Sequence, residues 1–261
     1  MAREWNAGAY EGLSSPQTRW GAEFLGRLEL RGAEDAIDAG CGTGKVTGLL
    51  LERLPRGTVL AVDGSRAMVE AAAERFAGEP RVRVEHQDLL ELEVEEPVDL
   101  IFSTATFHWI EDHNRLFGRL APALKPGGRL AAQCGGEGNI SRATRATREV
   151  MQGERFRPFF VGWDDDKNYA GAAETKGRLE EAGFAGVETW LHEELTGFGS
   201  VEELARFLQT VVLGGHMQRL PEAEREPFAE AVAEEIVAAD GEPLLDYVRL
   251  NMTAIRSEDG A

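Results

Sequence analysis

The sequence has few cysteines and no long apolar run. Its 261 residues include only two cysteines, Cys41 and Cys134, which are too few for a disulfide framework, and no cysteines and histidines have zinc-ligand spacing. No apolar run approaches the roughly 20 residues that cross a bilayer, and the first ten residues lack the apolar stretch of a signal peptide. These absences predict a cytoplasmic protein with no membrane segment, disulfide or metal site.

Basic residues are also scarce. The chain has 28 Lys and Arg against 46 Asp and Glu, which gives a formal charge of −18. Nucleic-acid phosphates require a basic footprint, so this balance argues against a nucleic-acid partner. Apolar residues make up 43% of the chain, near the globular average. We therefore expect a globular protein, monomeric or homodimeric, that binds a small molecule.

Short apolar segments alternate with helical patterns in the first half of the chain. The segments expected to form buried strands are 36–40, 58–63, 82–86, 98–103 and 128–133. Helical patterns lie between them at 44–53, 65–76 and 112–124, and Ser65 is a candidate N-cap. This alternation predicts right-handed βαβ units and a doubly wound α/β sheet with helices on both faces.

The second half is less regular. A helix at about 173–182 and a strand at 186–195 precede Ser200, which begins a capping box and a helical pattern that extends to about residue 239. A last strand is expected at 244–255. We predict a single domain over residues 1–261. Its expected parts are an N-terminal helical cap (1–30), a cofactor-binding half (31–134) and a substrate half (135–261) with a helical insertion at about 200–240.

A glycine-rich loop joins the first strand to the first helix. In open α/β sheets ligands bind at this carboxyl edge, and Gly40, Gly42 and Gly44 let the backbone approach a ligand where a Cβ would prevent it. A dinucleotide fingerprint would have its third glycine at the position of Lys45, so the spacing disfavours a dinucleotide. Asp38, just before the loop, would repel a pyrophosphate and attract an ammonium group.

Two further aspartates follow the next two strands. Asp63 ends the second strand, where a carboxylate can accept hydrogen bonds from both hydroxyls of a ribose. Asp88 follows the third strand, near the place expected for an adenine amino group. An ammonium group, a ribose diol and an adenine together describe S-adenosylmethionine, which we predict as the cofactor. Each aspartate taken alone is equally explained as a solvated strand-end acid or a helix cap.

Four motifs resemble those of the class I S-adenosylmethionine-dependent methyltransferases. IDAGCGTG is similar to the first motif of that family, AVDGS to its second, EHQDLL to its third and LKPGGRL to the beginning of a later strand. The resemblance extends from about Trp5 to Gln133 and more weakly to the end of the chain. It implies a Rossmann-like sheet of seven mostly parallel strands with the last strand antiparallel, helices on both faces, and a helical insertion that forms a lid over the substrate.

The resemblance also implies which residues hold the cofactor. The loop from Gly40 to Gly44 would hold the methionyl moiety, Asp63 the ribose, and Asp88 with Leu89 the adenine, while Ser103 and Thr104 would line the methionyl side. The full set of predicted cofactor-binding residues is Asp38, Gly40, Cys41, Gly42, Thr43, Gly44, Asp63, Gly64, Ser65, Met68, Asp88, Leu89, Ser103 and Thr104.

WNAGAY near the start, and TFHWIEDHNRLF at 106–117, resemble the trans-aconitate methyltransferases and the carboxylic-acid methyltransferases of the juvenile hormone acid type. In the second group a Gln follows an N-terminal Tyr by seven residues, as Gln17 follows Tyr10 here, and a His-Trp pair follows the fourth strand, as His108 and Trp109 do here. There the Gln and the Trp contact the substrate carboxylate. The aconitate enzymes often carry Arg in place of Gln17 and Gln in place of His108, and this chain departs from that pattern.

These features predict an S-adenosylmethionine-dependent O-methyltransferase that acts on a small-molecule carboxylate of the trans-aconitate kind and releases a methyl ester and S-adenosylhomocysteine. A carboxylate is ionised at pH 7 and needs no general base. Gln17, His108 and Trp109 are the predicted catalytic residues. Two alternatives stay open: a phenol, alcohol or amine acceptor with His108 as general base, or a cofactor-binding protein without activity. His113 is expected to lie at the surface.

An anionic substrate needs a local positive field in a chain with this charge. Arg142, Arg145 and Arg148 recur every three residues along one expected helix face, and arginine suits bidentate carboxylate binding. The alternative is a solvated face paired with neighbouring acids. The predicted substrate-binding residues are Tyr10, Gln17, Arg19, Trp109, Arg142 and Arg145.

Overall fold

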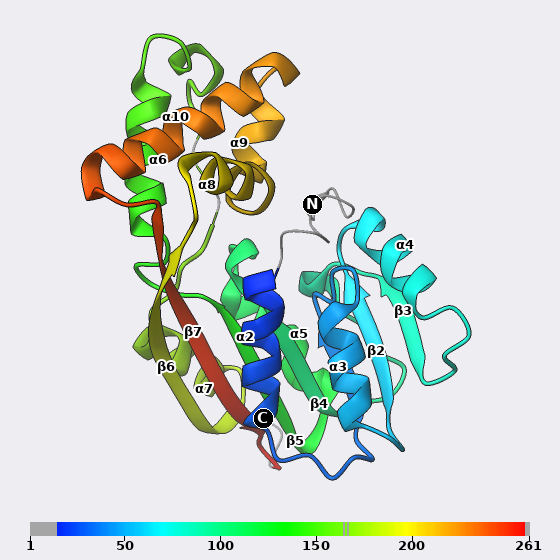
Figure 1. Ribbon diagram of the computed structural model, residues 1–261. Coiled ribbons are helices and arrows are strands. Elements are labelled where there is room, and N and C mark those ends of the chain that lie inside the picture. Colours follow the sequence, from blue (N-terminus) through cyan, green and yellow to red (C-terminus); the bar gives the residue numbers. More distant parts are fainter. Residues whose placement is uncertain (1–14, 164, 166, 259–261) are drawn as a thin grey trace. The chain divides into compact units, whose positions relative to one another are not determined.

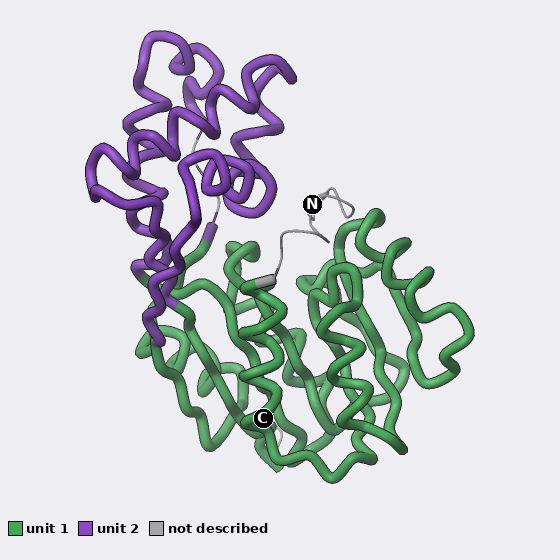
Figure 2. Tube along the Cα trace, viewed as in Figure 1, with its two compact units in different colours: residues 1–137, 168–191, 249–261 green, residues 138–167, 192–248 purple. Residues whose placement is uncertain are grey.

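The computed structural model describes residues 15–163, 165 and 167–258 (Figure 1). Two compact units divide the chain, and both are discontinuous in sequence (Figure 2). Unit 1 contains residues 1–137, 168–191 and 249–261, and unit 2 contains residues 138–167 and 192–248. The second unit thus combines the region of the predicted insertion with a segment some fifty residues earlier. Tyr10 lies outside the described residues.

A seven-stranded sheet confirms the predicted fold class. Its strand order is β3-β2-β1-β4-β5-β7-β6, and β5 and β7 pair antiparallel whereas the pairs among β1 to β5 are parallel. The strands are β1 (Asp35–Ala39), β2 (Thr58–Asp63), β3 (Val82–His86), β4 (Val98–Thr104), β5 (Leu124–Gly135), β6 (Phe184–Gly197) and β7 (Leu244–Arg256). The order changes direction between β1 and β4, and this places the loop after β1 at the point where open α/β sheets bind ligands.

Helices cover both faces of the sheet (Figure 1). Phe24, Leu50 and Phe102 belong to the core on one face, and Phe117, Leu120 and Leu179 to the core on the other. The helices of unit 1 are α2 (Ser15–Gly26), α3 (Lys45–Arg53), α4 (Arg66–Arg75), α5 (His113–Ala123) and α7 (Ala172–Glu181), with short 3-10 turns η1 (Leu89–Glu91) and η2 (Phe107–Trp109). Because the central strands are buried on both faces, they read as continuous apolar runs rather than alternating ones.

Unit 2 is built from helices. They are α6 (Ser141–Gln152), the 3-10 turn η3 (Arg157–Phe159), α8 (Val201–Phe207), the π-helical turn η4 (Leu208–Val212), α9 (Gly214–Arg219) and α10 (Glu222–Asp240). Phe228 of α10 is fully buried, with the rings of Phe156 and Phe160 centred 5.0 and 5.2 Å away. Ser200 caps α8 by accepting a hydrogen bond of 3.2 Å from the N–H of Glu203, as its capping-box sequence predicts.

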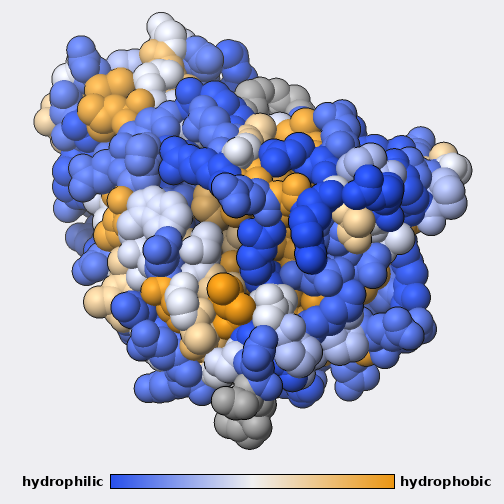
Figure 3. All heavy atoms as spheres, turned by 90° about the horizontal axis from the view of Figure 1, so that it is seen from below, coloured by the Kyte–Doolittle hydropathy of each residue, from blue (hydrophilic) through white to orange (hydrophobic). Residues whose placement is uncertain are grey.

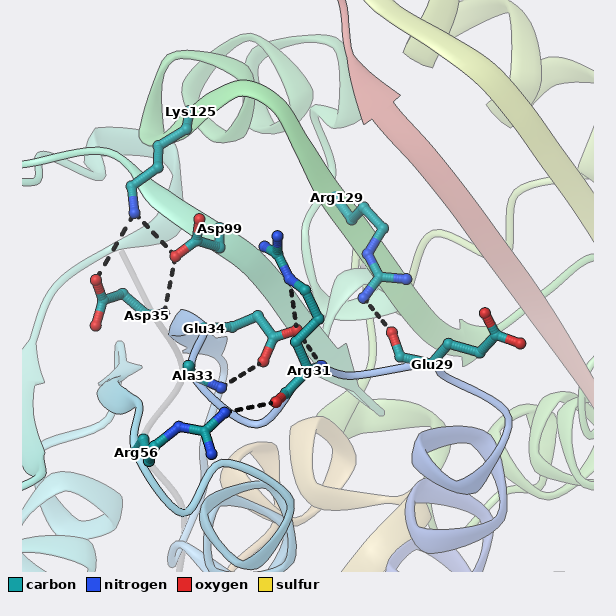
Figure 4. A network of polar contacts seen from close by, with 9 residues as sticks. All are labelled: Glu29, Arg31, Ala33, Glu34, Asp35, Arg56, Asp99, Lys125 and Arg129. Carbon is teal, nitrogen blue, oxygen red and sulfur yellow. Dashed lines mark hydrogen bonds and ion pairs between the residues drawn. The ribbon is translucent and has the colours of Figure 1, made fainter.

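A polar network ties together the amino ends of β1, β4 and β5 (Figure 4). Lys125 Nζ lies 2.8 Å from Asp99 and 3.7 Å from Asp35. Burial raises the pKa of Glu34, but hydrogen bonds from the backbone N–H groups of Arg31 and Ala33 outweigh it and hold the pKa below its usual value. These polar contacts stabilise the end of the sheet that lies opposite the ligand edge. The face of the molecule shown in Figure 3 is mostly hydrophilic.

His113 is not at the surface, contrary to expectation. It is 2% exposed, its Nε2 lies 2.9 Å from the carbonyl oxygen of Phe107, and desolvation lowers its pKa. The ring thus holds η2 against the start of α5. Within the described ranges, no helix is both long enough and apolar enough to span a membrane.

Candidate active site

The loop after β1 is fixed to β2 by its own backbone. The N–H groups of Gly40 and Cys41 both donate to the carbonyl oxygen of Val62, at 2.8 and 3.0 Å. A further bond of 3.0 Å, from Gly44 N–H to Cys41 O, closes the turn that leads into α3. Burial raises the pKa of the Cys41 thiol well above its usual value, with Asp38 and Asp63 adding to the effect. Cys41 is therefore an inert, small side chain in this loop.

The surroundings of the three loop glycines differ, so a side chain would be excluded for a different reason at each position. All three have positive φ angles, of 86°, 54° and 81° at Gly40, Gly42 and Gly44. A Cβ on Gly40 would lie 2.1 Å from Thr106 Oγ1, and one on Gly44 would lie 2.6 Å from the Phe76 ring. A Cβ on Gly42 would meet no atom within 4 Å. Gly42 is thus the glycine that faces open space, where a ligand can approach the backbone.

Asp38 is a buried acid beneath this loop. Its side chain is 1% exposed and accepts a hydrogen bond of 2.6 Å from Thr47 Oγ1 on α3. Desolvation raises its pKa to about 7, the Thr47 bond lowers it, and the nearby Asp63 charge raises it again. A cation next to Asp38 would stabilise the ionised form, as the prediction of an ammonium group requires.

Asp63, at the end of β2, is held by two backbone donors. Gly42 N–H donates to its Oδ2 at 2.9 Å, and Ser65 N–H donates to its Oδ1 at 2.8 Å. A carboxylate has about four acceptor positions and can therefore accept more than these two hydrogen bonds. The two bonds orient the carboxylate beside Gly42. Ser65 is the N-cap residue of α4, although its side chain makes no capping bond.

The remaining predicted cofactor residues lie at the ends of β3 and β4 and on α4. Asp88 caps η1 by accepting a bond of 3.0 Å from Leu90 N–H, and Leu89 beside it is buried. Ser103 Oγ donates to the carbonyl oxygen of Ala39 at 2.6 Å, which joins the end of β4 to that of β1. Met68 is buried on α4. Every one of these residues lies in unit 1.

His108 and Trp109 lie in η2, directly after β4. The N–H of Gly135, at the end of β5, donates to His108 Nδ1 at 3.2 Å. The His108 ring is 4.8 Å from the Trp109 ring and stacks on Tyr169 at 5.9 Å, measured between centroids. Because Nδ1 accepts a hydrogen bond, the neutral ring carries its proton on Nε2. His108 is therefore positioned as a hydrogen-bond donor.

Gln17 and Arg19 lie on α2. Among the described residues, Oε1 of Gln17 is a buried atom without a hydrogen-bond partner. Arg19 is half exposed and lies 4.0 Å from Glu23. Arg142 and Arg145 belong to α6 in unit 2, where Arg145 makes an ion pair of 2.6 Å with Asp240. The predicted substrate residues are thus divided between the two units, and their roles stay predictions.

Comparison with known proteins identifies the fold and the family. A sequence model of the methyltransferase domain matches residues 36–128. The trans-aconitate 2-methyltransferase of Methylobacterium nodulans is 31% identical over 274 residues, which cover 97% of this chain and 99% of the relative. That of Acidovorax sp. (strain JS42) is 28% identical over 260 residues, with the same coverage. The chain belongs to the class I S-adenosylmethionine-dependent methyltransferases.

Solved structures agree with this fold. The Haemonchus contortus phosphoethanolamine N-methyltransferase 2, in complex with S-adenosylhomocysteine, has a TM-score of 0.61 at 19% identity and covers 96% of this chain and 57% of that one. The YcgJ protein of Bacillus subtilis has a TM-score of 0.63 at 14% identity and covers 92% and 99%. The predicted family, enzyme class and cofactor are confirmed.

The residues of the methyltransferase fit the cofactor. Gly42 faces open space, Asp63 is oriented beside it by two backbone bonds, and Asp38 supplies a buried carboxylate whose ionised form needs a cation. These three features meet where β1 and β2 end. The assignment of the methionyl group to the glycine loop and of the ribose to Asp63 stays a prediction.

Three residues of the methyltransferase near this edge were not predicted. Thr106 packs on Gly40, Tyr169 stacks on His108, and Arg249 of β7 is paired in register with Gly135. Tyr169 and Arg249 come from segments 61 and 141 residues beyond His108 (169 − 108 and 249 − 108). Only the sheet pairing and the packing of residues 168–169 bring them to this edge, so local sequence patterns gave no signal for them.

Proposed function

We propose that this methyltransferase methylates a carboxylate of a small organic acid of the trans-aconitate kind. The observation that carries the proposal is the hydrogen bond from Gly135 N–H to His108 Nδ1. It leaves Nε2 of the neutral ring as a donor, whereas a general base needs a lone pair there. An acceptor that is already ionised at neutral pH suits such a site, and a carboxylate is ionised.

Neutral donors orient such an acceptor without protonating it. His108 Nε2–H, the Trp109 indole N–H and the Gln17 amide are the donors that we assign to the reacting carboxylate. When bound, S-adenosylmethionine supplies a methyl group on a sulfonium, and its transfer to a carboxylate oxygen leaves a methyl ester and S-adenosylhomocysteine with no proton released. An anion and a cation neutralise each other in this reaction, so excluding water strengthens their attraction.

Full-length relatives support the acid class. Both trans-aconitate 2-methyltransferases named above match along 97% of this chain, so the resemblance includes the segments beyond the cofactor loop. The alternative of a phenol, alcohol or amine acceptor assigns the role of general base to His108, and an un-ionised hydroxyl needs such a base. The hydrogen bond from Gly135 N–H holds the neutral His108 ring in the tautomer with its proton on Nε2. A general base acting through Nε2 would need that proton on Nδ1.

The test is a screen of small carboxylic acids and phenols for S-adenosylhomocysteine release, with proton release followed by an indicator dye in weak buffer. We expect acids to react without release of a proton and to give products that alkali hydrolyses to methanol. A phenol would release one proton per turnover and give an alkali-stable ether. Turnover of phenols alone would refute the proposal, and no turnover with any acceptor would favour a cofactor-binding protein without activity.

A further inference from the structure

The turn η2, which carries His108 and Trp109, has few hydrogen bonds of its own. It spans three residues, and its backbone hydrogen bonds, donated by the N–H groups of Trp109 and Ile110, are both 2.9 Å. The hydrogen bonds of 3-10 turns have poorer geometry than those of an α-helix. Ala105, which leads into the turn, has a φ of 56°, in the left-handed region that costs free energy for residues other than glycine. Contacts from outside the turn must therefore hold η2 in place.

The apolar core fixes the first residue of η2. Phe107 is fully buried, and its carbonyl oxygen accepts a hydrogen bond of 2.9 Å from His113 Nε2. His108 and Trp109 are only partly buried. Packing in the core therefore does not by itself determine the directions of their side chains.

Asn168 binds the second half of the turn and the residues that follow it. Its backbone N–H donates to the carbonyl oxygen of His108 at 2.9 Å. Its side-chain amide nitrogen lies 2.9 Å from the carbonyl oxygen of Glu111 and 3.4 Å from that of Ile110. The amide has two N–H groups, one for each of these acceptors. A single residue, 60 positions after His108 (168 − 108), thus binds three carbonyl oxygens of this loop.

The segment that contains Asn168 is itself attached to the sheet. The carbonyl oxygen of Ala170 accepts a hydrogen bond of 3.0 Å from the N–H of Glu137, two residues after the end of β5. Tyr169, next to Asn168, stacks its ring on that of His108 at 5.9 Å between centroids. The end of β5 therefore provides a fixed support from which Asn168 holds η2.

We infer that Asn168 is a positioning residue for methyl transfer, because it holds His108 and Trp109 in the direction from which they bind the acceptor. This inference rests on the proposed function, in which these two residues donate hydrogen bonds to the reacting carboxylate. Asn168 acts through η2 and needs no contact with the acceptor. In-line transfer requires the acceptor oxygen to be aligned with the methyl group, and a misplacement of about 1 Å can lower the rate about 100-fold. Loss of the Asn168 amide should therefore lower kcat rather than the affinity for the cofactor.

Three variants separate the amide donors of Asn168 from its other properties. Asn168→Ala removes the side-chain donors and keeps the backbone bond to His108, and kcat with the best acceptor from the screen should fall at least about tenfold. Asn168→Asp places a carboxylate oxygen against two carbonyl oxygens, so kcat should fall further. Asn168→Gln keeps an amide and should retain more activity than the alanine variant. In all three the dissociation constant of S-adenosylhomocysteine should stay within about twofold of the wild-type value.

Amide hydrogen exchange of Gly135 reports the position of His108 without turnover. The N–H of Gly135 donates to His108 Nδ1, so it should exchange at least about tenfold faster when η2 shifts. We expect this acceleration in Asn168→Ala and in Asn168→Asp. His108→Ala, which removes the acceptor directly, gives the exchange rate of the unbonded amide. Ala132, in the same strand, is the internal reference, because a general loss of stability would accelerate both amides, whereas a shift of η2 accelerates Gly135 alone.

Asn114→Asp is the matched control for charge. Asn114 is exposed in the first turn of α5, where a carboxylate favours the helix, so this variant should keep the wild-type kcat and the wild-type exchange of Gly135. If Asn168→Asp lowers kcat and Asn168→Ala does not, the effect is one of charge and the inference is overturned. Wild-type exchange of Gly135 in Asn168→Ala overturns it as well.

The outcomes distinguish this inference from the proposed function. If Gly135 exchanges faster in Asn168→Ala while kcat with an acid is unchanged, Asn168 holds η2 without positioning it for the reaction, so the inference is overturned while carboxyl methylation stands. If no acid is methylated, the proposed function fails, whereas the exchange of Gly135, and kcat with any other acceptor found, still decide the role of Asn168.

Discussion

The side chain of Thr106 occupies the space that a Cβ on Gly40 would take. Thr106 Oγ1 lies 3.2 Å from the carbonyl oxygen of Gly40 and 3.0 Å from that of Thr104, so its single proton is shared between these two acceptors. Thr106, two residues after the end of β4, thereby packs against the loop after β1. Gly40 is required by this packing and by its φ of 86°, whereas Gly42 leaves open the space that we assign to the cofactor.

The two glycines should respond differently to alanine. Gly40→Ala should lower the free energy of unfolding by about 2–4 kcal/mol, because Thr106 must move and alanine is strained at positive φ. Gly42→Ala should cost only about 1 kcal/mol but weaken S-adenosylhomocysteine binding at least about tenfold. Urea denaturation and calorimetry measure the two effects.

Matched variants make this contrast specific. Gly48→Ala in α3, where a Cβ meets no atom within 4 Å, should be neutral or stabilising because alanine favours helix. Combining Gly40→Ala with Thr106→Ala should recover part of the lost stability. Equal losses of stability in the Gly40 and Gly42 variants would contradict the different roles assigned to them.

Asp63→Ala should weaken binding of S-adenosylhomocysteine by an order of magnitude or more. It removes the carboxylate assigned to the ribose and the acceptor for Gly42 and Ser65 N–H, and hydrogen bonds to charged groups contribute about 1.5–3 kcal/mol each. Asp112→Asn is a suitable control, because asparagine also caps helices well at the start of α5. An unchanged dissociation constant in calorimetry would remove the ribose assignment.

Much of the sheet of unit 1 could be predicted from local sequence patterns. Strands were predicted at 36–40 and 58–63 and lie at Asp35–Ala39 and Thr58–Asp63, because short apolar runs between turn residues specify buried strands. Motif resemblance supplied the antiparallel last strand. The candidate roles of Asp38 and Asp63 also came from position alone, since parallel strands end at one edge of the sheet.

Long-range pairing accounts for what the sequence did not predict. Arg249 lies beside Gly135, 114 residues earlier (249 − 135), because of the β5–β7 register, and no local pattern encodes that register. His113 reads as a polar residue opening a helix, yet its bond to Phe107 O satisfies it inside the core. Helix α6 joins unit 2 through packing with α10, so the second unit includes more than the predicted insertion.

Asp38 should make cofactor binding depend on pH near neutrality. Its pKa of about 7 in the free protein means that it is increasingly protonated below pH 7, and a bound ammonium group requires the ionised form. The affinity for S-adenosylhomocysteine should therefore fall as the pH drops below 7, by up to about tenfold per unit. Titration calorimetry between pH 5.5 and 8.5 measures this, and Asp38→Asn should abolish the dependence.

The stability of the ligand-free protein should change in the opposite direction. The pKa of Asp38 is higher in the folded chain than its usual value of 3.8, so the folded state binds the proton more tightly than the unfolded state does. Its contribution to stability is present at low pH and is lost as the pH rises through about 7. The difference in unfolding free energy between wild type and Asp38→Asn should follow this course, and a difference that is constant with pH would contradict the raised pKa.

His108 offers the sharpest test of how the acceptor is bound. His108→Gln supplies an amide N–H donor in place of Nε2–H and should keep much of the activity, whereas His108→Ala should lower kcat at least about tenfold at every pH, because a hydrogen bond to the charged carboxylate is lost. The measurement is kcat between pH 5.5 and 9 at saturating S-adenosylmethionine, which removes the Asp38 effect on binding. A general base would give a different pattern: glutamine would be as inactive as alanine, and an acidic limb in the wild-type profile would disappear in both variants. Similar melting temperatures for the two variants would show that the lost Gly135 bond does not explain the difference.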